Sequence, residues 1–229
     1  MQKPQKFSKE VTRTIGCEYL ISFPANYDTN SKTGFPLILF LHGAGERGTD
    51  IWNASVHGPS KYAEQHPDFP FMLVTPLCPA EEVWTNELLL ELLDELNAKH
   101  KVDDQRIYLT GLSMGGYGAW NLGLSRPEKF AALAPICGGG ERIEILLAAR
   151  GFSGPIKLQN LQKLPVWAFH GARDPVVPVE ESERMFKALT EAKCEDVKLT
   201  VYPEAQHDSW TETYNNPELY AWFLKHKRK

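Results

Sequence analysis

The sequence has no long hydrophobic run, little cysteine and no excess of positive charge. No stretch approaches the roughly 20 apolar residues that a membrane-spanning helix needs. Residues 1–8 also lack the apolar core of a signal peptide. We therefore expect a cytoplasmic protein, while a secreted protein whose signal peptide has been removed would give the same pattern.

Charge and cysteine content exclude further classes of protein. The 25 Lys and Arg residues are outnumbered by 29 Asp and Glu residues, so the net charge is -4. This balance argues against electrostatic binding to nucleic acid or to an anionic membrane. The four cysteines (Cys17, Cys78, Cys137 and Cys194) are dispersed, without a C-x-x-C motif or a nearby histidine pair. We expect reduced, packed thiols, no disulfide framework, no metal and no cofactor.

Length and patterning predict one α/β domain over residues 1–229. Runs typical of strands occur twice within 9–24 and then at 35–41, 71–76, 107–110, 130–136, 166–169 and 197–202. Helical patterns occur at 87–100, after Ser113, at 142–149, at 178–192 and at 217–227. This order predicts a mostly parallel sheet with an antiparallel N-terminal edge and helices on both faces. Ligands of such sheets bind beyond the carboxyl ends of the strands.

The segment Gly111-Leu112-Ser113-Met114-Gly115 lies between a predicted strand and a predicted helix. Glycine two residues either side of a serine permits a very sharp strand-to-helix turn, because larger side chains there would collide. The turn presents the serine hydroxyl at the end of the strand, beside the positive end of the helix. We therefore interpret Ser113 as a nucleophile; a glycine-rich loop with an incidental serine is the structural alternative.

A serine nucleophile needs a base and an acid that orients the base. His207 follows the last predicted strand and could reach Ser113, whereas His42 and His170 directly follow strands and are expected to shape their loops. Asp174 follows the penultimate strand and is the expected acid, with a turn-capping role as the alternative. Asp208 adjoins the histidine in sequence, where the required geometry is rare. The order Ser113, Asp174, His207 is that of α/β-hydrolases.

A glycine-rich loop, His42-Gly43-Ala44-Gly45-Glu46-Arg47-Gly48, follows the strand at 35–41. A phosphate-binding role is disfavoured because no Gly-Lys-Ser/Thr follows the glycines. An oxyanion-hole loop is the better interpretation, and a simple turn remains open.

Nearly the whole chain resembles the α/β-hydrolases of the phospholipase/carboxylesterase and prolyl-oligopeptidase-like group, in particular small lidless bacterial esterases often labelled predicted peptidases. The matching stretches are Leu41–Gly48, Pro76–Pro79 with Trp84, Gly111–Trp120, His170–Asp174 and His207–Trp210. The resemblance implies Ser113 as nucleophile, His207 as base and Asp174 as orienting acid. It also implies an oxyanion hole from the N–H groups of Met114 and Ala44, and no large lid. Dienelactone hydrolases, the branch with a sulfur nucleophile, would need cysteine at position 113.

Three functions compete at this stage. The first is a serine carboxylesterase acting on short-chain or aryl esters, with a small-molecule ester as its partner. The second is a peptidase or amidase acting on short peptides, and the third is a non-catalytic binding module that retains the fold. Candidate substrate contacts are Glu46, Trp84 and Trp210, with Trp52 as a further aromatic that could line the pocket. The oligomeric state stays open.

Overall fold

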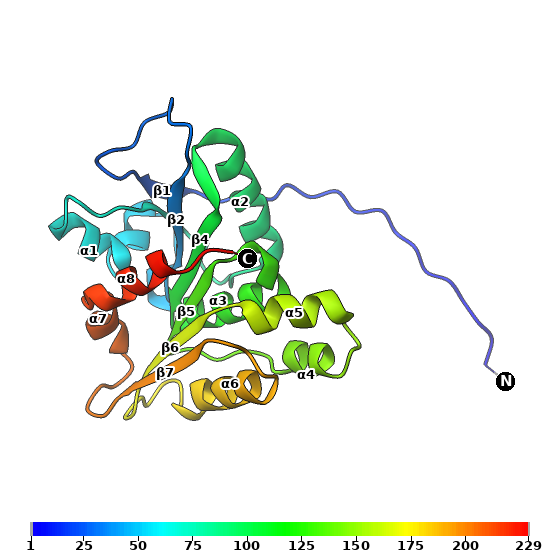
Figure 1. Cartoon of the computed structure of the whole chain (residues 1–229). Coiled ribbons are helices and arrows are strands. Elements are labelled where there is room, and N and C mark those ends of the chain that lie inside the picture. Colours follow the sequence, from blue (N-terminus) through cyan, green and yellow to red (C-terminus); the bar gives the residue numbers. More distant parts are fainter. Residues whose placement is uncertain (1, 229) are drawn as a thin grey trace.

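A seven-stranded sheet lies at the centre of the computed structural model, which describes residues 2–228 (Figure 1). Its strands are β1 (Tyr19–Ser22), β2 (Phe35–Leu41), β3 (Met72–Pro76), β4 (Val102–Leu112), β5 (Ala132–Ile136), β6 (Val166–Gly171) and β7 (Val197–Tyr202). The order across the sheet is β1-β3-β2-β4-β5-β6-β7. Strand β1 is antiparallel to β3, and every other neighbouring pair is parallel. The predicted sheet with an antiparallel edge is confirmed.

Helices cover both faces of the sheet, as the sequence predicts. On one face lie α2 (Asn86–Lys99), α3 (Met114–Ser125), α4 (Ile143–Ala149), α5 (Pro155–Lys163) and α6 (Glu180–Glu191). On the other lie α1 (Pro59–Gln65), α7 (Ser209–Tyr214) and α8 (Pro217–Lys225). Short 3-10 helices η1 (Ala44–Glu46), η2 (Ile51–Ser55) and η3 (Pro127–Lys129) lie in the connections.

Strand β2 shows why this arrangement is stable. Leu37, Leu39 and Leu41 belong to the hydrophobic cluster under α2 and α3, while Ile38 and Phe40 belong to the cluster under α7 and α8. Successive side chains of a strand point to opposite faces, so a strand covered on both sides must be apolar throughout. All five side chains are fully buried.

The N-terminal segment differs from its prediction. Two strands were expected between residues 9 and 24, but only Tyr19–Ser22 forms a strand. Residues 2–12 run away from the sheet as an extended, exposed segment (Figure 1), whereas residues 13–18 lead back along α2 to β1. A strand needs a neighbouring strand for its backbone hydrogen bonds. Strand β1 pairs with the outer edge of β3, and the second expected strand has no further edge of β3 to pair with.

The segment between β5 and β6 also differs from its prediction. One short helix was expected there, whereas two form, and the second is preceded by Gly154 with φ 80° and by a proline at its first position. Helix α5 packs against α4 and η3, and α4 also contacts α3 and α6.

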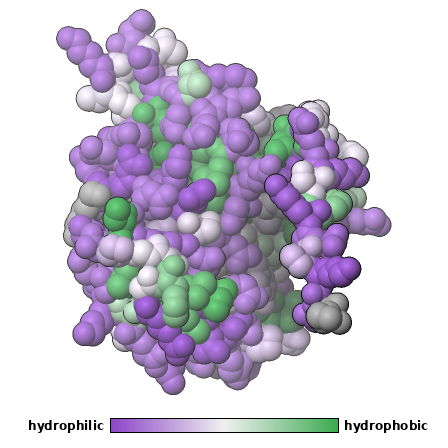
Figure 2. Space-filling model, turned by 90° about the vertical axis from the view of Figure 1, so that its right-hand side faces the viewer, coloured by the Kyte–Doolittle hydropathy of each residue, from purple (hydrophilic) through white to green (hydrophobic). Residues whose placement is uncertain are grey.

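The outer surface is mainly hydrophilic, with hydrophobic residues gathered in small patches on the face seen in Figure 2. Exposed apolar side chains in and beside α4 and α5 are Ile143, Leu146, Phe152 and Ile156. Among residues 2–228, no helix is both long and apolar enough to cross a bilayer.

Candidate active site

Ser113 occupies a strained turn between the end of β4 and the start of α3. Its φ of 52° and ψ of -116° lie outside the regions that L-residues favour. An ideal Cβ on Gly111 would lie 2.3 Å from the carbonyl oxygen of Gly115, and one on Gly115 would lie 1.9 Å from that of Leu41. Only glycine fits at either position. The Ser113 N–H donates to the Ile136 carbonyl at 3.0 Å, which holds the turn against β5.

The side chains of Ser113, His207 and Asp174 meet at the carboxyl ends of β4, β6 and β7. Nε2 of His207 lies 2.9 Å from Oγ of Ser113, and Nδ1 lies 2.7 Å from Oδ2 of Asp174. An ionised carboxylate only accepts, so Nδ1 carries the proton of the neutral ring. Nε2 is then free to accept the proton of the serine hydroxyl, as a general base must.

The side chain of Asp174 is fully buried, and both oxygens of its carboxylate are hydrogen-bonded. Oδ1 accepts from the backbone N–H groups of Val176 at 2.8 Å and Val177 at 2.9 Å. Burial raises the pKa of Asp174, but the hydrogen bonds from His207, Val177 and Val176 outweigh it and lower the pKa below its usual 3.8. The carboxylate is therefore charged at neutral pH and holds the imidazole in the tautomer described above.

His170 and His42 are buried histidines that organise the surrounding loops. Nε2 of His170 lies 3.2 Å from Oδ2 of Asp174 and 2.9 Å from the Val177 carbonyl. Nε2 of His42 accepts from the Cys78 N–H at 3.0 Å, so Nδ1 carries the proton and donates to the Gly43 carbonyl at 2.7 Å. Burial lowers the pKa of His42, which keeps this ring neutral.

The glycine-rich loop after β2 lies against the nucleophile. A Cβ placed on Gly43 would come within 3.6 Å of the Ser113 Cβ. The N–H groups of Ala44 and Met114, at the starts of η1 and α3, donate no hydrogen bond to any group within residues 2–228. Arg47 fastens the loop by donating to the carbonyls of Ala44 at 3.0 Å and Glu82 at 2.9 Å.

Trp84 packs against this loop and is mostly buried. The residue is 7% exposed, and its indole N–H donates to the His42 carbonyl at 3.0 Å. Contact between Trp84 and the substrate stays a prediction. The indole nitrogen supports the loop, because a buried indole N–H requires a partner.

Glu46 and Trp210 border the site together with His57, which sequence reasoning did not select. The Trp210 ring stands edge-on to His207 at 5.3 Å between centroids and lies 5.7 Å from His57. Oε1 of Glu46 lies 3.8 Å from Nε2 of His57, and Oε2 is buried without a hydrogen bond. His57 has no sequence signal of its own, because the 3-10 helix that carries the chain toward it follows no simple hydropathy period.

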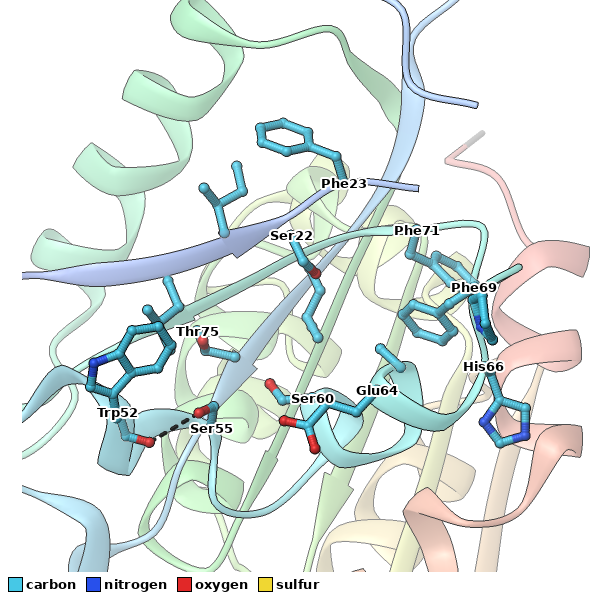
Figure 3. A pocket seen from close by; sticks show the side chains of 15 residues that line it. Ser22, Phe23, Trp52, Ser55, Ser60, Glu64, His66, Phe69, Phe71 and Thr75 are labelled. Atoms are coloured by element: carbon cyan, nitrogen blue, oxygen red, sulfur yellow. Dashed lines mark hydrogen bonds between the residues drawn. The ribbon is translucent and has the colours of Figure 1, made fainter. Parts of the chain in front are cut away.

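A separate cavity of about 460 Å³ lies between β1, η2, α1 and β3 (Figure 3). Phe23, Trp52, Phe69 and Thr75 are among the side chains around it, whereas Ser113, His207 and Asp174 are not. Trp52, which is 67% exposed, lines this cavity. Within residues 2–228, no group of three or more His, Cys, Asp or Glu side chains could hold a metal ion.

Comparisons with known proteins identify relatives over most of the chain. "Probable feruloyl esterase C" from Aspergillus terreus is 25% identical over 184 residues, which are 78% of this chain and 62% of that protein. A solved thermostable esterase is 32% identical, with a TM-score of 0.73, over 92% of this chain and 59% of the other. The chain thus spans about three fifths of the length of these relatives.

More distant structures share the fold. Acyl-protein thioesterase 2 from Zea mays is 15% identical with a TM-score of 0.65, over 91% of this chain and 98% of the other. The family model of the dienelactone hydrolases matches residues 60–220, a segment that includes Ser113, Asp174 and His207. Position 113 is serine and not the cysteine of the sulfur-nucleophile branch. On this match, the chain belongs to the dienelactone hydrolase family.

Proposed function

We propose that this protein is a serine esterase that hydrolyses carboxylic esters through an acyl-enzyme on Ser113. The observation that carries the proposal is the linked pair of hydrogen bonds from Ser113 to His207 at 2.9 Å and from His207 to Asp174 at 2.7 Å. Esterases among the relatives support the reaction class. Residues 2–228 would then act as one catalytic domain.

The first half-reaction forms the acyl-enzyme. Oγ of Ser113 attacks the ester carbonyl carbon while Nε2 of His207 takes the hydroxyl proton, and Asp174 stabilises the resulting imidazolium. Negative charge develops on the carbonyl oxygen. The N–H groups of Ala44 and Met114, which have no partner within residues 2–228, are the proposed donors to it. The imidazolium then protonates the leaving alcohol as the tetrahedral intermediate collapses.

Hydrolysis of the acyl-enzyme repeats these steps with water as the nucleophile. Nε2 of His207 removes a proton from water, the hydroxide attacks the acyl carbon, and the same N–H groups hold the oxyanion. The proton returns to Oγ of Ser113 when the carboxylic acid leaves. No other co-reactant is needed for the balance of the reaction.

For the substrate we propose a short-chain or aryl ester. Ser113 and His207 are partly exposed, which supports direct approach of a small ester to Oγ from solvent. Trp210 offers an aromatic wall beside His207. The feruloyl group named for the Aspergillus terreus relative is an acyl group that carries an aromatic ring.

We further propose that Glu46 and His57 bind a hydroxyl group of the substrate. The Glu46 side chain is 13% exposed, and its buried Oε2 has no hydrogen bond although it lies 3.9 Å from Nδ1 of His42; an unpaired buried polar atom is costly. Oε1 of Glu46 and Nε2 of His57 are 3.8 Å apart, so a hydroxyl beside the pair can lie at hydrogen-bond distance from both, donating to Oε1 and accepting from Nε2.

The reaction class is tested by a substrate panel of p-nitrophenyl esters from acetyl to palmitoyl, methyl ferulate and aminoacyl-nitroanilides. We expect the acetyl to butyryl p-nitrophenyl esters or methyl ferulate to have the highest kcat/KM, without activation at a lipid interface. Faster cleavage of the nitroanilides would favour a peptidase, and turnover of none of the panel by folded protein would favour a binding module.

A further inference from the structure

Cys17 and Cys78 lie opposite each other at the end of the antiparallel ladder between β1 and β3. Tyr19 pairs with Pro76, and one step further the N–H of Leu77 donates to the carbonyl of Glu18 at 2.9 Å. The next pair in this register is Cys17 with Cys78. The two cysteines are 61 positions apart in sequence, so only the folded register brings them together.

The pair occupies the kind of position that suits a disulfide. Hydrogen-bonded and non-hydrogen-bonded pairs alternate along an antiparallel ladder. Because Glu18 and Leu77 share a hydrogen bond, Cys17 and Cys78 form a non-hydrogen-bonded pair, whose Cα atoms are typically about 4.5 Å apart. Disulfides span Cα separations of about 4.4–6.8 Å.

The two side chains also point to the same face of the sheet. Cys78 belongs to the hydrophobic cluster under α2 and α3, together with Val74, and Cys17 packs against that cluster along with Tyr19. Alternation by two residues along each strand places all four side chains on this face. Cys78 is buried, Cys17 is half-buried, and both thiols are free in the structure.

We propose that Cys17 and Cys78 are a site of disulfide formation, with a small-molecule disulfide such as oxidised glutathione as the oxidant. The half-buried Cys17 thiolate attacks one sulfur of the oxidant and releases one glutathione thiolate. The Cys78 thiolate then attacks the Cys17 sulfur and releases the second. The two cysteine thiols together lose two electrons and two protons. One oxidised glutathione takes up these electrons and protons and becomes two molecules of reduced glutathione.

The bridge would fasten the N-terminal segment to the loop that borders Ser113. The Cys78 N–H donates to Nε2 of His42, and its carbonyl accepts from the Gly48 N–H at 3.2 Å. Burial raises the pKa of each thiol to about 11, so exchange is slow in both directions at neutral pH. Closing a loop of about 60 residues should raise the thermal midpoint by roughly 5–15 °C.

The test equilibrates the full chain in glutathione buffers of graded redox ratio at mildly alkaline pH, starting from both reduced and oxidised protein. We expect loss of two hydrogen atoms by intact mass and a single cross-linked peptide pair that contains Cys17 and Cys78. The thermal midpoint should rise with the oxidised fraction. Cys137 and Cys194 should remain alkylatable after denaturation.

Two variants make the outcome decisive. Cys17→Ser should abolish both the cross-link and the redox dependence of the thermal midpoint, whereas Cys194→Ser should leave both as in the parent chain. The proposal is overturned if Cys17 and Cys78 stay free at full oxidation, if Cys17 carries only a glutathione adduct, or if another cysteine pair forms instead.

Discussion

Nε2 of His170 lies 3.2 Å from Oδ2 of Asp174, and both side chains are fully buried. The same oxygen is 2.7 Å from Nδ1 of His207. His170 is itself fixed, because its Nδ1 lies 2.7 Å from Oγ of Ser182. The carboxylate thus contacts two histidines, of which one faces the nucleophile and the other fixes the position of Asp174 from behind.

We expect His170→Asn to lower kcat by about 10–100-fold, because small displacements of a catalytic group can cost up to about 10²-fold. The shorter amide loses the contact with Oδ2 of Asp174, so only the hydrogen bonds to Val176, Val177 and His207 then fix the carboxylate. His66→Asn is the matched control, since it makes the same substitution at a histidine that contacts the Tyr62 carbonyl and lines the separate cavity. Steady-state kinetics and thermal unfolding are measured together. A folded His170→Asn with the kcat of the parent chain would contradict a positioning role.

Ala44→Pro should reduce kcat by about 10²–10³, or roughly 2.7–4 kcal/mol, because proline deletes one proposed oxyanion donor. Gly45→Ala serves as the control: it keeps its N–H, and a Cβ there meets no atom within 4 Å. Fluorophosphonate labelling of Ser113 and the thermal midpoint report whether the loop is distorted. If a folded Ala44→Pro variant keeps nearly the kcat of the parent chain, the second oxyanion donor is not the Ala44 N–H, and the Gly45 N–H is the next candidate.

The free energy of unfolding should fall as the pH is lowered from about 7 toward 5, partly through His42. Burial lowers the pKa of His42 below 6.5, so the unfolded chain binds a proton there that the folded chain does not. Protonation of the unfolded state therefore removes stability below about pH 6.5. Urea unfolding of His42→Gln should show a shallower pH dependence across this window. An unchanged dependence in the variant would show that His42 makes no contribution.

Glu46→Leu should reduce kcat/KM about 10–100-fold more for an ester with a hydroxyl near the reacting carbonyl than for its deoxy counterpart, since hydrogen bonds to charged groups contribute about 1.5–3 kcal/mol. Methyl 3-hydroxybutyrate against methyl butyrate tests the acyl side. Glycerol monobutyrate against propyl butyrate tests the alcohol side. Glu91→Leu, an exposed position on α2, is the control. Equal losses within both pairs would argue against hydroxyl binding.

Much of the fold could be predicted because its strands have simple signals. The run from Phe35 to Leu41 is apolar throughout, and the helix at Asn86–Lys99 repeats its leucines with helical spacing. The position of Ser113 followed from its flanking glycines, whose contacts in the structure leave no room for a side chain. These features are local, so the sequence alone contains them.

The features that the sequence did not predict depend on tertiary contacts or belong to short elements. Helix α1 has only seven residues, and its signals are Gly58 at φ 82° and the proline that follows. His57 is placed by its contacts with Glu46 and Trp210, which no local pattern encodes. The second strand expected within residues 9–24 does not form, because it has no neighbouring strand to supply its backbone hydrogen bonds. The support that Trp84 gives to the glycine-rich loop could not be predicted, because the partner of its indole N–H, the His42 carbonyl, lies 42 positions away.

The most direct test of the proposed chemistry is labelling with a fluorophosphonate probe, combined with turnover of p-nitrophenyl butyrate. The probe reacts with an activated serine, and the proposed geometry activates only Ser113 through His207. We expect one equivalent of label on Ser113, with loss of labelling and of ester turnover in a folded Ser113→Ala. Labelling of a different serine, or parental turnover by Ser113→Ala, would contradict the assignment.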